Sequence, residues 1–368
     1  MQVAIIGAGI GGLALAQGLK QAGVEVRLYE RDPSPRFRKQ GYRIHISPVG
    51  ESALRSVLPA EVRRRVIETA THPGDLVAGF DSSLTKTFEQ VFPGGGPETV
   101  SAIDRYAFRR ALMTGLDDVL VFGKQFTSYA EKAGRVEISF EDGSTATADV
   151  LVGADGVGSR VRGQLVPDFE VIDSGIRCIY GKVPVTSGLQ VPPEFLRGFC
   201  FIAGGQGPGM AFGPVLFRTP PEEYGDYLMA VMTGTQEQLG HSDDELFGMP
   251  AEELWKLVSK HVAGWHPSVG ELVDAADASA AFPITLRTCT NVASWTSGRV
   301  TLLGDAVHPM LPSAGAGANT ALWDAARLTD ALLGGSLPQY EIEMRTHGLA
   351  AVDESLQNAK RLFNLELG

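Results

Sequence analysis

The chain has 368 residues, of which 44% are hydrophobic and 20% are charged, and its formal net charge is -11. A chain of this length and composition can bury two sizeable cores, so we expect folded lobes rather than disorder. The negative charge is the opposite of what binding to phosphate backbones or anionic lipid requires. We therefore expect no nucleic acid and no membrane surface as a partner.

The cysteines and the apolar segments indicate a reducing compartment. Cys178, Cys200 and Cys289 form no C-x-x-C pair and leave one cysteine over, so we expect neither a disulfide framework nor a metal site. The apolar start, residues 1–19, lacks a basic leader, and no other apolar run reaches membrane-spanning length. These features predict a cytoplasmic protein.

The first thirty residues predict a βαβ unit. A short apolar strand over residues 2–6 is followed by helical spacing over 10–22, and a second strand over 24–29 leads to Glu30. This order places a nucleotide site at the start of the chain.

The turn between the first strand and the helix contains Gly7, Gly9, Gly11 and Gly12, which fit the pattern G-x-G-x-x-G. In this pattern the first glycine allows a tight turn, the second lets a diphosphate approach the backbone, and the last lets the helix pack close to the strand. A carboxylate at Glu30 can accept hydrogen bonds from the hydroxyls of an adenosine ribose. The pattern alone does not separate NAD from FAD.

The segment after Glu30 has mixed helices and strands. We expect, in chain order, a basic loop over 31–43, a helix over 48–57, strands within 76–102, a helix over 105–116 capped by Asp104, and a hairpin that feeds a buried strand at 150–152.

Two further glycine-aspartate segments stand at the ends of predicted strands. Gly153 leads to Asp155, and Gly304 is followed directly by Asp305. Ligands bind outside the carboxyl ends of the strands of an open parallel sheet, so these two turns and the first glycine turn can line one crevice. A long cofactor can span such a crevice, and Asp305 can accept hydrogen bonds from a sugar-alcohol chain.

The segment that contains Gly315, Gly317, Ala318 and Asn319 opens a helix predicted over residues 318–333. A helix amino terminus favours negative charge, and a reduced isoalloxazine ring carries negative charge near N1. This segment is therefore our candidate for contact with a flavin.

Residues 171–285 predict a mostly β lobe with one amphipathic helix over 251–262, and helical spacing returns over 339–365. Within this lobe, two strands flank a glycine-rich loop and predict a hairpin. Phe201, Met210 and Phe212 on these strands are candidates for the wall of a substrate pocket, with ordinary core packing as the alternative.

With these motifs in place, the chain resembles the single-component (class A) FAD-dependent aromatic hydroxylases, the family of para-hydroxybenzoate hydroxylase. The matching segments are spread over nearly the full length, in the family's order. The resemblance implies an α/β fold with a Rossmann-like FAD-binding domain of the glutathione-reductase type, interleaved with a mostly β substrate domain and followed by carboxyl-terminal helices. The implied FAD-binding domain comprises residues 1–72, 103–170 and 286–368, and the implied substrate domain comprises 73–102 and 171–285.

The resemblance also implies residue roles. Glu30 and Arg31 hold the adenosine end, Arg105 contacts the cofactor, Asp155 lies near the diphosphate, and Asp305 binds the ribityl chain. The remaining cofactor-binding candidates are the glycine-turn and loop residues Gly7, Gly9, Gly11, Gly12, Arg43, Gly304, Pro309, Gly315, Gly317, Ala318 and Asn319.

The activity that the resemblance implies is insertion of one oxygen atom of O2 into a small electron-rich substrate, aromatic or polyketide-like, through a flavin C4a-hydroperoxide. NADPH or NADH would reduce the FAD. No second G-x-G-x-x-G follows a strand, so we expect the pyridine nucleotide to bind transiently. Arg36, Arg38 and Arg43 either receive its phosphates or form a solvated basic loop. His45 and Arg43 are the candidate catalytic side chains, since the flavin carries most of the chemistry.

Several alternatives stay open at this point. Flavin halogenases of this fold carry W-x-W-x-x-P, which the segment Trp265, His266, Pro267 does not supply, and a double-bond reductase or an FAD-containing non-redox cyclase is a further possibility. A plain NAD-dependent dehydrogenase would leave Asp155 and Asp305 unexplained. The substrate, the preferred pyridine nucleotide and the oligomeric state are not predicted.

Overall fold

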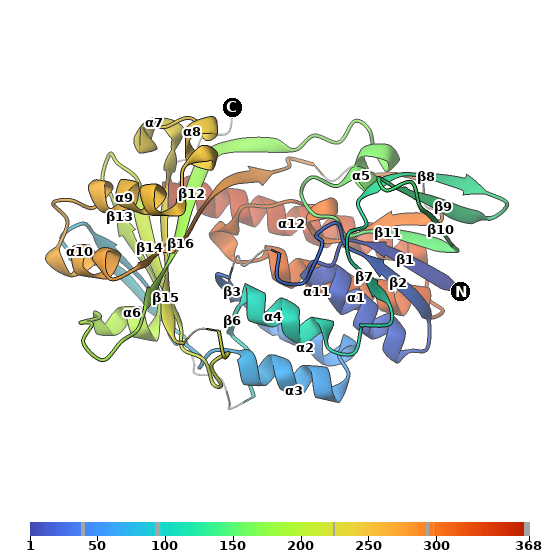
Figure 1. The fold of residues 1–368 in the computed structure, drawn as a ribbon, viewed down its shortest axis with the longest axis horizontal. Helices are drawn as coiled ribbons and strands as arrows, with labels where there is room; N and C mark the ends of the chain where they lie inside the picture. Colours follow the sequence, from blue (N-terminus) through green and yellow to red (C-terminus); the bar gives the residue numbers. More distant parts are fainter. Residues whose placement is uncertain are drawn as a thin grey trace.

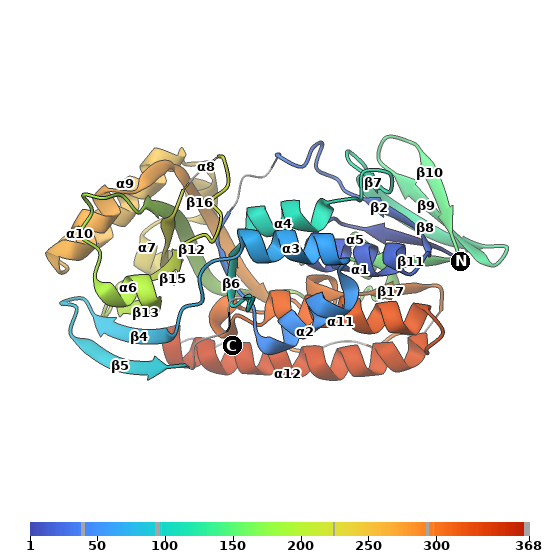
Figure 2. The same ribbon diagram turned by 90° about the horizontal axis from the view of Figure 1, so that it is seen from below.

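A computed structural model describes residues 1–37, 41–92, 96, 98–223, 225–291, 294–296 and 298–363. The chain forms two lobes that lie side by side, one around a parallel sheet and one around a larger, mostly antiparallel sheet (Figure 1). The long helix α12 (Leu337–Phe363) runs along both of them (Figure 2). This arrangement confirms the predicted α/β fold with an interleaved β lobe.

The parallel sheet has the strand order β17-β11-β1-β2-β7. Its central strand β1 (Gln2–Ile6) is apolar on both faces because helices and a second sheet cover it, as is typical of parallel strands. Ile6 pairs with Gly153 of β11, which pairs in turn with Leu302 of β17, so three strand ends lie at the same level. The remaining bounds are β2 (Glu25–Tyr29), β7 (Leu120–Val121), β11 (Val150–Gly153) and β17 (Val300–Leu302).

Helices and a small sheet cover this parallel sheet. The helix α1 (Ile10–Gln21) packs against α11 (Gly317–Leu332), and Gly18 of α1 leaves room for Thr329. The other covering elements are α2 (Pro48–Val57), α3 (Ala60–Thr69), α4 (Arg105–Met113), α5 (Arg160–Leu165), β8 (Phe126–Lys132), β9 (Arg135–Phe140) and β10 (Thr145–Ala148). The helix predicted over 48–57 is confirmed, whereas the one predicted over 105–116 ends at Met113 because Gly115 turns the chain with a φ of 73°.

The second lobe is built on a seven-stranded sheet with the order β16-β12-β15-β14-β13-β4-β5. β13 (Gly198–Ala203) and β14 (Gly209–Val215) form the predicted antiparallel hairpin, while β13 pairs with β4 in parallel. The other strands are β4 (Leu76–Asp81), β5 (Lys86–Val91), β12 (Ile172–Pro184), β15 (Tyr227–Thr235) and β16 (Asp277–Thr288).

The two faces of this sheet are buried against different partners. Alternate residues such as Phe212 and Leu228 pack in one core with the helices α9 (Ala251–His261) and α10 (Pro267–Asp274). Their neighbours such as Ala211 and Met229 pack toward the first lobe in another core. The second face therefore forms the junction between the lobes.

The β lobe contains more helices than the single one predicted. The described residues there form α6 (Pro193–Arg197), α7 (Gln236–Leu239), α8 (Asp243–Gly248), α9 (Ala251–His261) and α10 (Pro267–Asp274). Only α9 is long enough to show a full apolar stripe in sequence; the others have four to eight residues and give little periodic signal. Among the described helices, none combines the length and the apolar character needed to cross a membrane.

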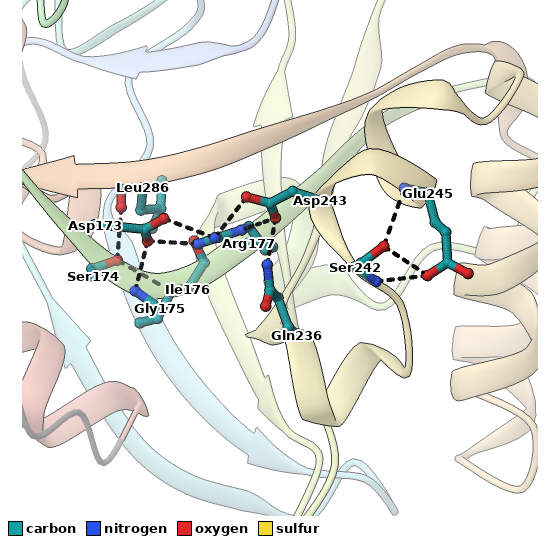
Figure 3. Close-up of polar contacts among 10 residues, drawn as sticks. All are labelled: Asp173, Ser174, Gly175, Ile176, Arg177, Gln236, Ser242, Asp243, Glu245 and Leu286. Carbon is teal, nitrogen blue, oxygen red and sulfur yellow. Dashed lines mark hydrogen bonds and ion pairs between the residues drawn. The ribbon is translucent and has the colours of Figure 1, made fainter.

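A buried arginine clamps β12 to α8 (Figure 3). Arg177 is 4% exposed, and its guanidinium donates two hydrogen bonds to Asp173, at 2.7 and 2.8 Å, and two to Asp243, at 2.5 and 2.9 Å. Asp243 opens α8 directly after Ser242, which forms a capping box with Glu245. The hydrogen bond from Arg177 lowers the pKa of Asp243 below its usual value of 3.8.

The Arg177→Met variant should lose about 1–2 kcal/mol of unfolding free energy at pH 7. A fully buried pair would cost about 3–5 kcal/mol, but water can solvate the freed carboxylates, which are 46% and 39% exposed. The contribution is present above the unfolded pKa of 3.8 and is lost as the pH falls through the lower folded value. Denaturant titrations at pH 7 and pH 3 should therefore show a smaller deficit at pH 3.

The matched control is Arg197→Met, which removes an exposed two-bond pair with Asp75 and should cost less at pH 7. If both variants lost the same free energy of unfolding, or if the loss in Arg177→Met did not change with pH, the stabilising role of the Arg177 clamp would be contradicted.

Candidate functional site

Three strand-end turns meet at the carboxyl edge of the parallel sheet. Gly7, with a φ of 105°, lies so close to the second turn that a Cβ there would be 2.4 Å from the carbonyl oxygen of Ala154. The Ala154 N–H donates to Ile6 O at 2.8 Å, and the Leu303 N–H donates to Gly153 O at 3.0 Å. The predicted convergence of the glycine turn with the two glycine-aspartate turns is therefore confirmed.

The glycines of the first turn have different surroundings. A Cβ at Gly12 would lie 2.1 Å from Gly7 O, so this glycine is needed for packing, whereas one at Gly11 would lie 2.6 Å from Leu303 Cδ1, the end of a side chain that can shift. Among the residues that the structure describes, no atom lies within 4 Å of a Cβ placed at Gly9, which is the N-cap of α1 and makes no side-chain cap hydrogen bond. The first turn of α1 also lacks acidic residues, so its N–H groups can receive an anion such as a diphosphate.

The length of this edge suits an extended dinucleotide. Glu30 follows β2 and Asp305 follows β17, and β1 and β11 lie between them. Three strand spacings of about 4.8 Å separate the two carboxylates by roughly 14 Å along the edge. The open position at Gly9 lies between the two ends.

Glu30 is 8% exposed and is fixed by the glycine turn. Its Oε2 accepts from the Ala8 N–H at 2.9 Å, and its Oε1 accepts from the Asp32 N–H at 3.0 Å. Arg109 of α4 contacts the same group, with Nη2 3.4 Å from Oε2. Arg109 was not predicted from the sequence because an arginine within a helix is ordinarily a surface residue.

A second buried arginine connects the other two turns. Arg162 donates to Val157 O of the second turn at 2.8 Å and to Ala306 O of the third at 3.0 Å, and it is 6% exposed. Asp155 accepts from the Arg160 N–H at 2.8 Å and from the Ser159 hydroxyl, so its carboxylate orders the start of α5. Asp155 therefore fixes the second turn and does not stand free toward a ligand.

Asp305 differs from Asp155 in that its carboxylate does not hold the backbone of its own turn. Its side chain is accessible to solvent, and it has no hydrogen bond or ion pair within the described ranges. Protein atoms nevertheless surround it closely enough that burial raises its pKa above 3.8, against the charges of His308 and Arg105. An accessible, unpaired carboxylate in these surroundings fits a sugar hydroxyl chain as its missing partner.

The third turn is held from behind by a buried pair. His308 and Asp324 are both 0% exposed, and His308 Nε2 lies 2.7 Å from Asp324 Oδ2. Burial alone would lower the pKa of His308, but the charge of Asp324 and its hydrogen bond outweigh burial and raise the pKa above 6.5. Asp324 also accepts from the Gly304 N–H at 2.8 Å, so the pair fixes the backbone beside Asp305.

Asn319 connects the start of α11 to the strand β3 (Arg43–His45). Its side chain accepts from the Ser47 N–H at 2.8 Å and donates to His45 O at 3.0 Å and to Gly315 O at 2.9 Å. These contacts use the amide for the protein itself, so Asn319 shapes the loop. Gly317 lies in this loop, with the position of a Cβ 3.9 Å from Asp305 Oδ1.

The strand β3 pairs with β6 (Ala102–Asp104) at the junction of the lobes. Asp104, 0% exposed, accepts from the Tyr227 hydroxyl at 2.6 Å and lies 3.6 Å from Lys182 Nζ. The same carboxylate caps α4 through the Ala107 N–H. These contacts place Arg105, the next residue, over the ring of Tyr42 at 5.6 Å.

The two candidate catalytic side chains both lie on β3. The Arg43 guanidinium carbon lies 5.7 Å from the Phe199 ring centre, its Nε is buried without an acceptor, and burial lowers its pKa to about 10. Burial and the charge of Arg43 lower the pKa of His45 below 6.5, so its imidazole is neutral at pH 7. His45 borders the flavin-loop candidate Gly315, where a Cβ would lie 3.4 Å from His45 Cβ.

The substrate-wall candidates divide between the two faces of the sheet. Phe201 packs toward the first lobe, in an edge contact with Phe199 at 4.7 Å. Met210 and Phe212 point the other way, into the helix-covered core, and are 2% and 0% exposed. They therefore do not face the same space as Phe201, because successive residues of a strand alternate between faces.

Other aromatic residues on the junction face were not singled out in the sequence. The Tyr180 ring stacks on Phe282 at 5.5 Å and contacts Tyr42 at 5.2 Å. Strand alternation starting from Phe201 would have found Phe199, but the pairing of β12 with β16 depends on segments about one hundred residues apart.

The remaining candidates differ in exposure. Arg31 and Arg36 are exposed, Ala318 is half-buried and Pro309 is buried. Arg38 lies outside the described residues.

Comparisons with known proteins agree with this geometry. The FAD binding domain family matches residues 100–335, and an NAD(P)-binding Rossmann-like domain matches residues 5–49. A crystal structure from Photorhabdus luminescens, assigned as an FAD-containing monooxygenase, superposes with a TM-score of 0.85 at 31% identity, with 99% of each chain covered.

Two relatives have named activities. The 3-amino-4-hydroxybenzoate 2-monooxygenase of Streptomyces platensis is 30% identical over 341 residues, which cover 90% of this chain and 79% of the relative. A dual O-methyltransferase/FAD-dependent monooxygenase of Cercospora beticola is 32% identical over 412 residues, which cover 98% of this chain and 46% of the relative. The chain thus spans about half the length of that dual enzyme. By these matches, the chain belongs to the family of FAD-dependent aromatic hydroxylases and monooxygenases.

Proposed function

We propose that the protein is an FAD-dependent monooxygenase that uses NADPH or NADH and O2 to insert one oxygen atom into a small electron-rich substrate, aromatic or polyketide-like. The observation that carries the proposal is the edge formed by three touching turns, with the open Gly9 position between Glu30 and the unpaired Asp305. The cofactor supplies the redox chemistry when bound, and the protein binds and orients it and excludes water.

The residues along the edge would each bind a different part of the cofactor. Glu30 would accept from the adenosine ribose, and the N–H groups at Gly9 and the start of α1 would bind the diphosphate. Asp305 would accept from the ribityl hydroxyls, and the backbone of residues 315–318 would face the isoalloxazine ring. Arg105, which follows the helix-capping Asp104, would contact the cofactor, and its charge interaction with Asp305 supports this role.

We further propose that the substrate lies between this edge and the aromatic junction face. Phe199, Phe201, Tyr180 and Phe282 offer flat apolar contact there, and the half-buried Arg43 offers a cation. The neutral imidazole of His45 can accept a proton from a substrate hydroxyl.

The domain division stays as proposed from the sequence, with 1–72, 103–170 and 286–368 holding FAD and 73–102 and 171–285 holding the substrate. A small molecule is the expected partner, and the three free cysteines favour a cytoplasmic location.

The test of the proposed function is oxygen uptake by the purified, yellow protein with NADPH or NADH and a panel of phenols and polyketide phenols. We expect a phenol that increases both uptake and pyridine nucleotide oxidation, with one atom of 18O2 in its product. A protein that binds FAD but gives product without NAD(P)H or O2 would instead be the cyclase. If no product formed under 18O2 contained 18O, oxygen insertion would be contradicted.

The Asp305→Asn variant should bind FAD about 10- to 100-fold more weakly, since it loses charged hydrogen bonds to the ribityl chain. Its apoprotein should unfold at the same denaturant concentration as the unmodified apoprotein or a higher one, because the carboxylate has no partner within the described ranges. Flavin fluorescence titration and denaturation measure the two effects. Asp330→Asn on the exposed part of α11 is the control, and unchanged FAD affinity in Asp305→Asn would refute the assignment.

The Arg36→Ala/Arg38→Ala double variant should raise the NADPH concentration for half-maximal flavin reduction about threefold to tenfold, as the loss of two ion pairs with the NADPH phosphates allows. Arg36 is exposed, and Arg38 lies outside the described residues. Anaerobic stopped-flow reduction gives the measurement. The exposed Arg64→Ala on α3 is the control; if the double variant behaves like it, the basic loop does not receive NADPH.

A further inference from the structure

Arg109 is a buried cation that no motif of the sequence accounts for. It lies on α4, its side chain is 9% exposed, and it points toward the first glycine turn rather than to solvent. Its neighbour Arg110 is 42% exposed and pairs with Glu223 at the surface. Burial of a guanidinium is costly unless it is paired and hydrogen-bonded, so its position needs a reason.

The contacts of Arg109 form a closed ring with Ala8 and Glu30. The Ala8 N–H donates to Glu30 Oε2 at 2.9 Å, and the Ala8 carbonyl accepts from Arg109 Nε at 2.8 Å. Arg109 Nη2 completes the ring at 3.4 Å from the same Glu30 oxygen. The N–H and the carbonyl group of Ala8 in the glycine turn and one carboxylate oxygen of Glu30 are thus fixed together.

The ring leaves the other carboxylate oxygen for a ligand. A carboxylate oxygen has two lone-pair positions. Oε2 of Glu30 uses both, on Ala8 and Arg109, whereas Oε1 accepts only from the Asp32 N–H, at 3.0 Å, within the described part of the chain. One acceptor position therefore remains on Oε1, beside the turn that carries Gly9.

We propose that Arg109 is a positioning residue for the adenosine half of FAD, which acts through Glu30: anchored on Ala8, it fixes one oxygen of Glu30 so that the other, Oε1, faces the ribose hydroxyls. This rests on the proposed function only in that the bound dinucleotide is FAD. The planar guanidinium reaches a carbonyl and a carboxylate at once, which a lysine ammonium on a flexible chain does not reproduce. The competing role is direct contact with the diphosphate, which would not depend on Glu30.

The experiment is a double-mutant cycle on FAD binding to apoprotein, with Arg109→Met, Glu30→Gln and the two combined. Fluorescence quenching of added FAD gives the dissociation constants, and thermal unfolding of each apoprotein gives its stability. Each single variant should weaken FAD binding about 10- to 100-fold. The combined variant should bind FAD within about twofold of Glu30→Gln, because Arg109 acts through Glu30. The matched control Arg110→Met should leave FAD affinity unchanged.

Losses that multiply in the combined variant would show that Arg109 acts independently of Glu30 and would overturn the proposal, as would an Arg109→Met variant that binds FAD like Arg110→Met. If Arg109→Met does not fold, Arg109→Lys takes its place in the cycle, and we expect its loss of FAD affinity to be intermediate. If Arg109→Lys bound FAD as tightly as the unmodified protein, the role of Arg109 as a donor to two acceptors would be refuted. Failure of the unmodified apoprotein to bind FAD would refute the proposed function itself, so the two failures are distinct.

Discussion

The structure depends on the contact of three backbone turns at the carboxyl edge of one parallel sheet. β1, β11 and β17 are neighbours in register, so the turns that follow them, from three distant parts of the sequence, lie against one another. Gly7 and Gly12 are required at this contact because any side chain would strike the backbone of Ala154 or of Gly7 itself. Gly9 alone of these three faces open space, and it is there that a ligand can approach the start of α1.

Buried polar side chains hold the turns in place. Arg109 connects the first turn to Glu30, Arg162 connects the second turn to the third, and Asp324 holds the third from behind with His308. Burying polar and charged groups costs folding free energy unless they are hydrogen-bonded or paired. Their hydrogen bonds therefore restrict the conformation of the edge more than they add to the stability of the fold. A cofactor that meets such an edge does not have to order it, which lowers the cost of binding. Asp305 is accessible and has no partner among the described residues, and it is the group that we propose the cofactor satisfies.

Local patterns in the sequence predicted much of this site. The strand-turn-helix with Gly7 to Gly12, the acid at Glu30 and the strand-end Asp305 each carry their signal within about thirty residues, and all three are at the predicted edge. Arg109 and Arg162 could not be found in this way, because a buried arginine is recognised only when its distant carbonyl partners are known. The same reason explains the aromatic junction face, where β12 meets β16, and the placement of Met210 and Phe212 on the opposite face. The short helices α6, α7, α8 and α10 were missed because four to eight residues show almost no periodicity.

A crystal structure of the protein with FAD tests this account most directly. We expect the diphosphate beside Gly9 and the first N–H groups of α1, the adenosine ribose on Glu30 and the ribityl chain on Asp305. The backbone of the three turns should stay within about 1 Å of its position without the cofactor, as is usual for preorganised sites. A diphosphate bound away from Gly9, or an Asp305 carboxylate without contact to the cofactor, would contradict it.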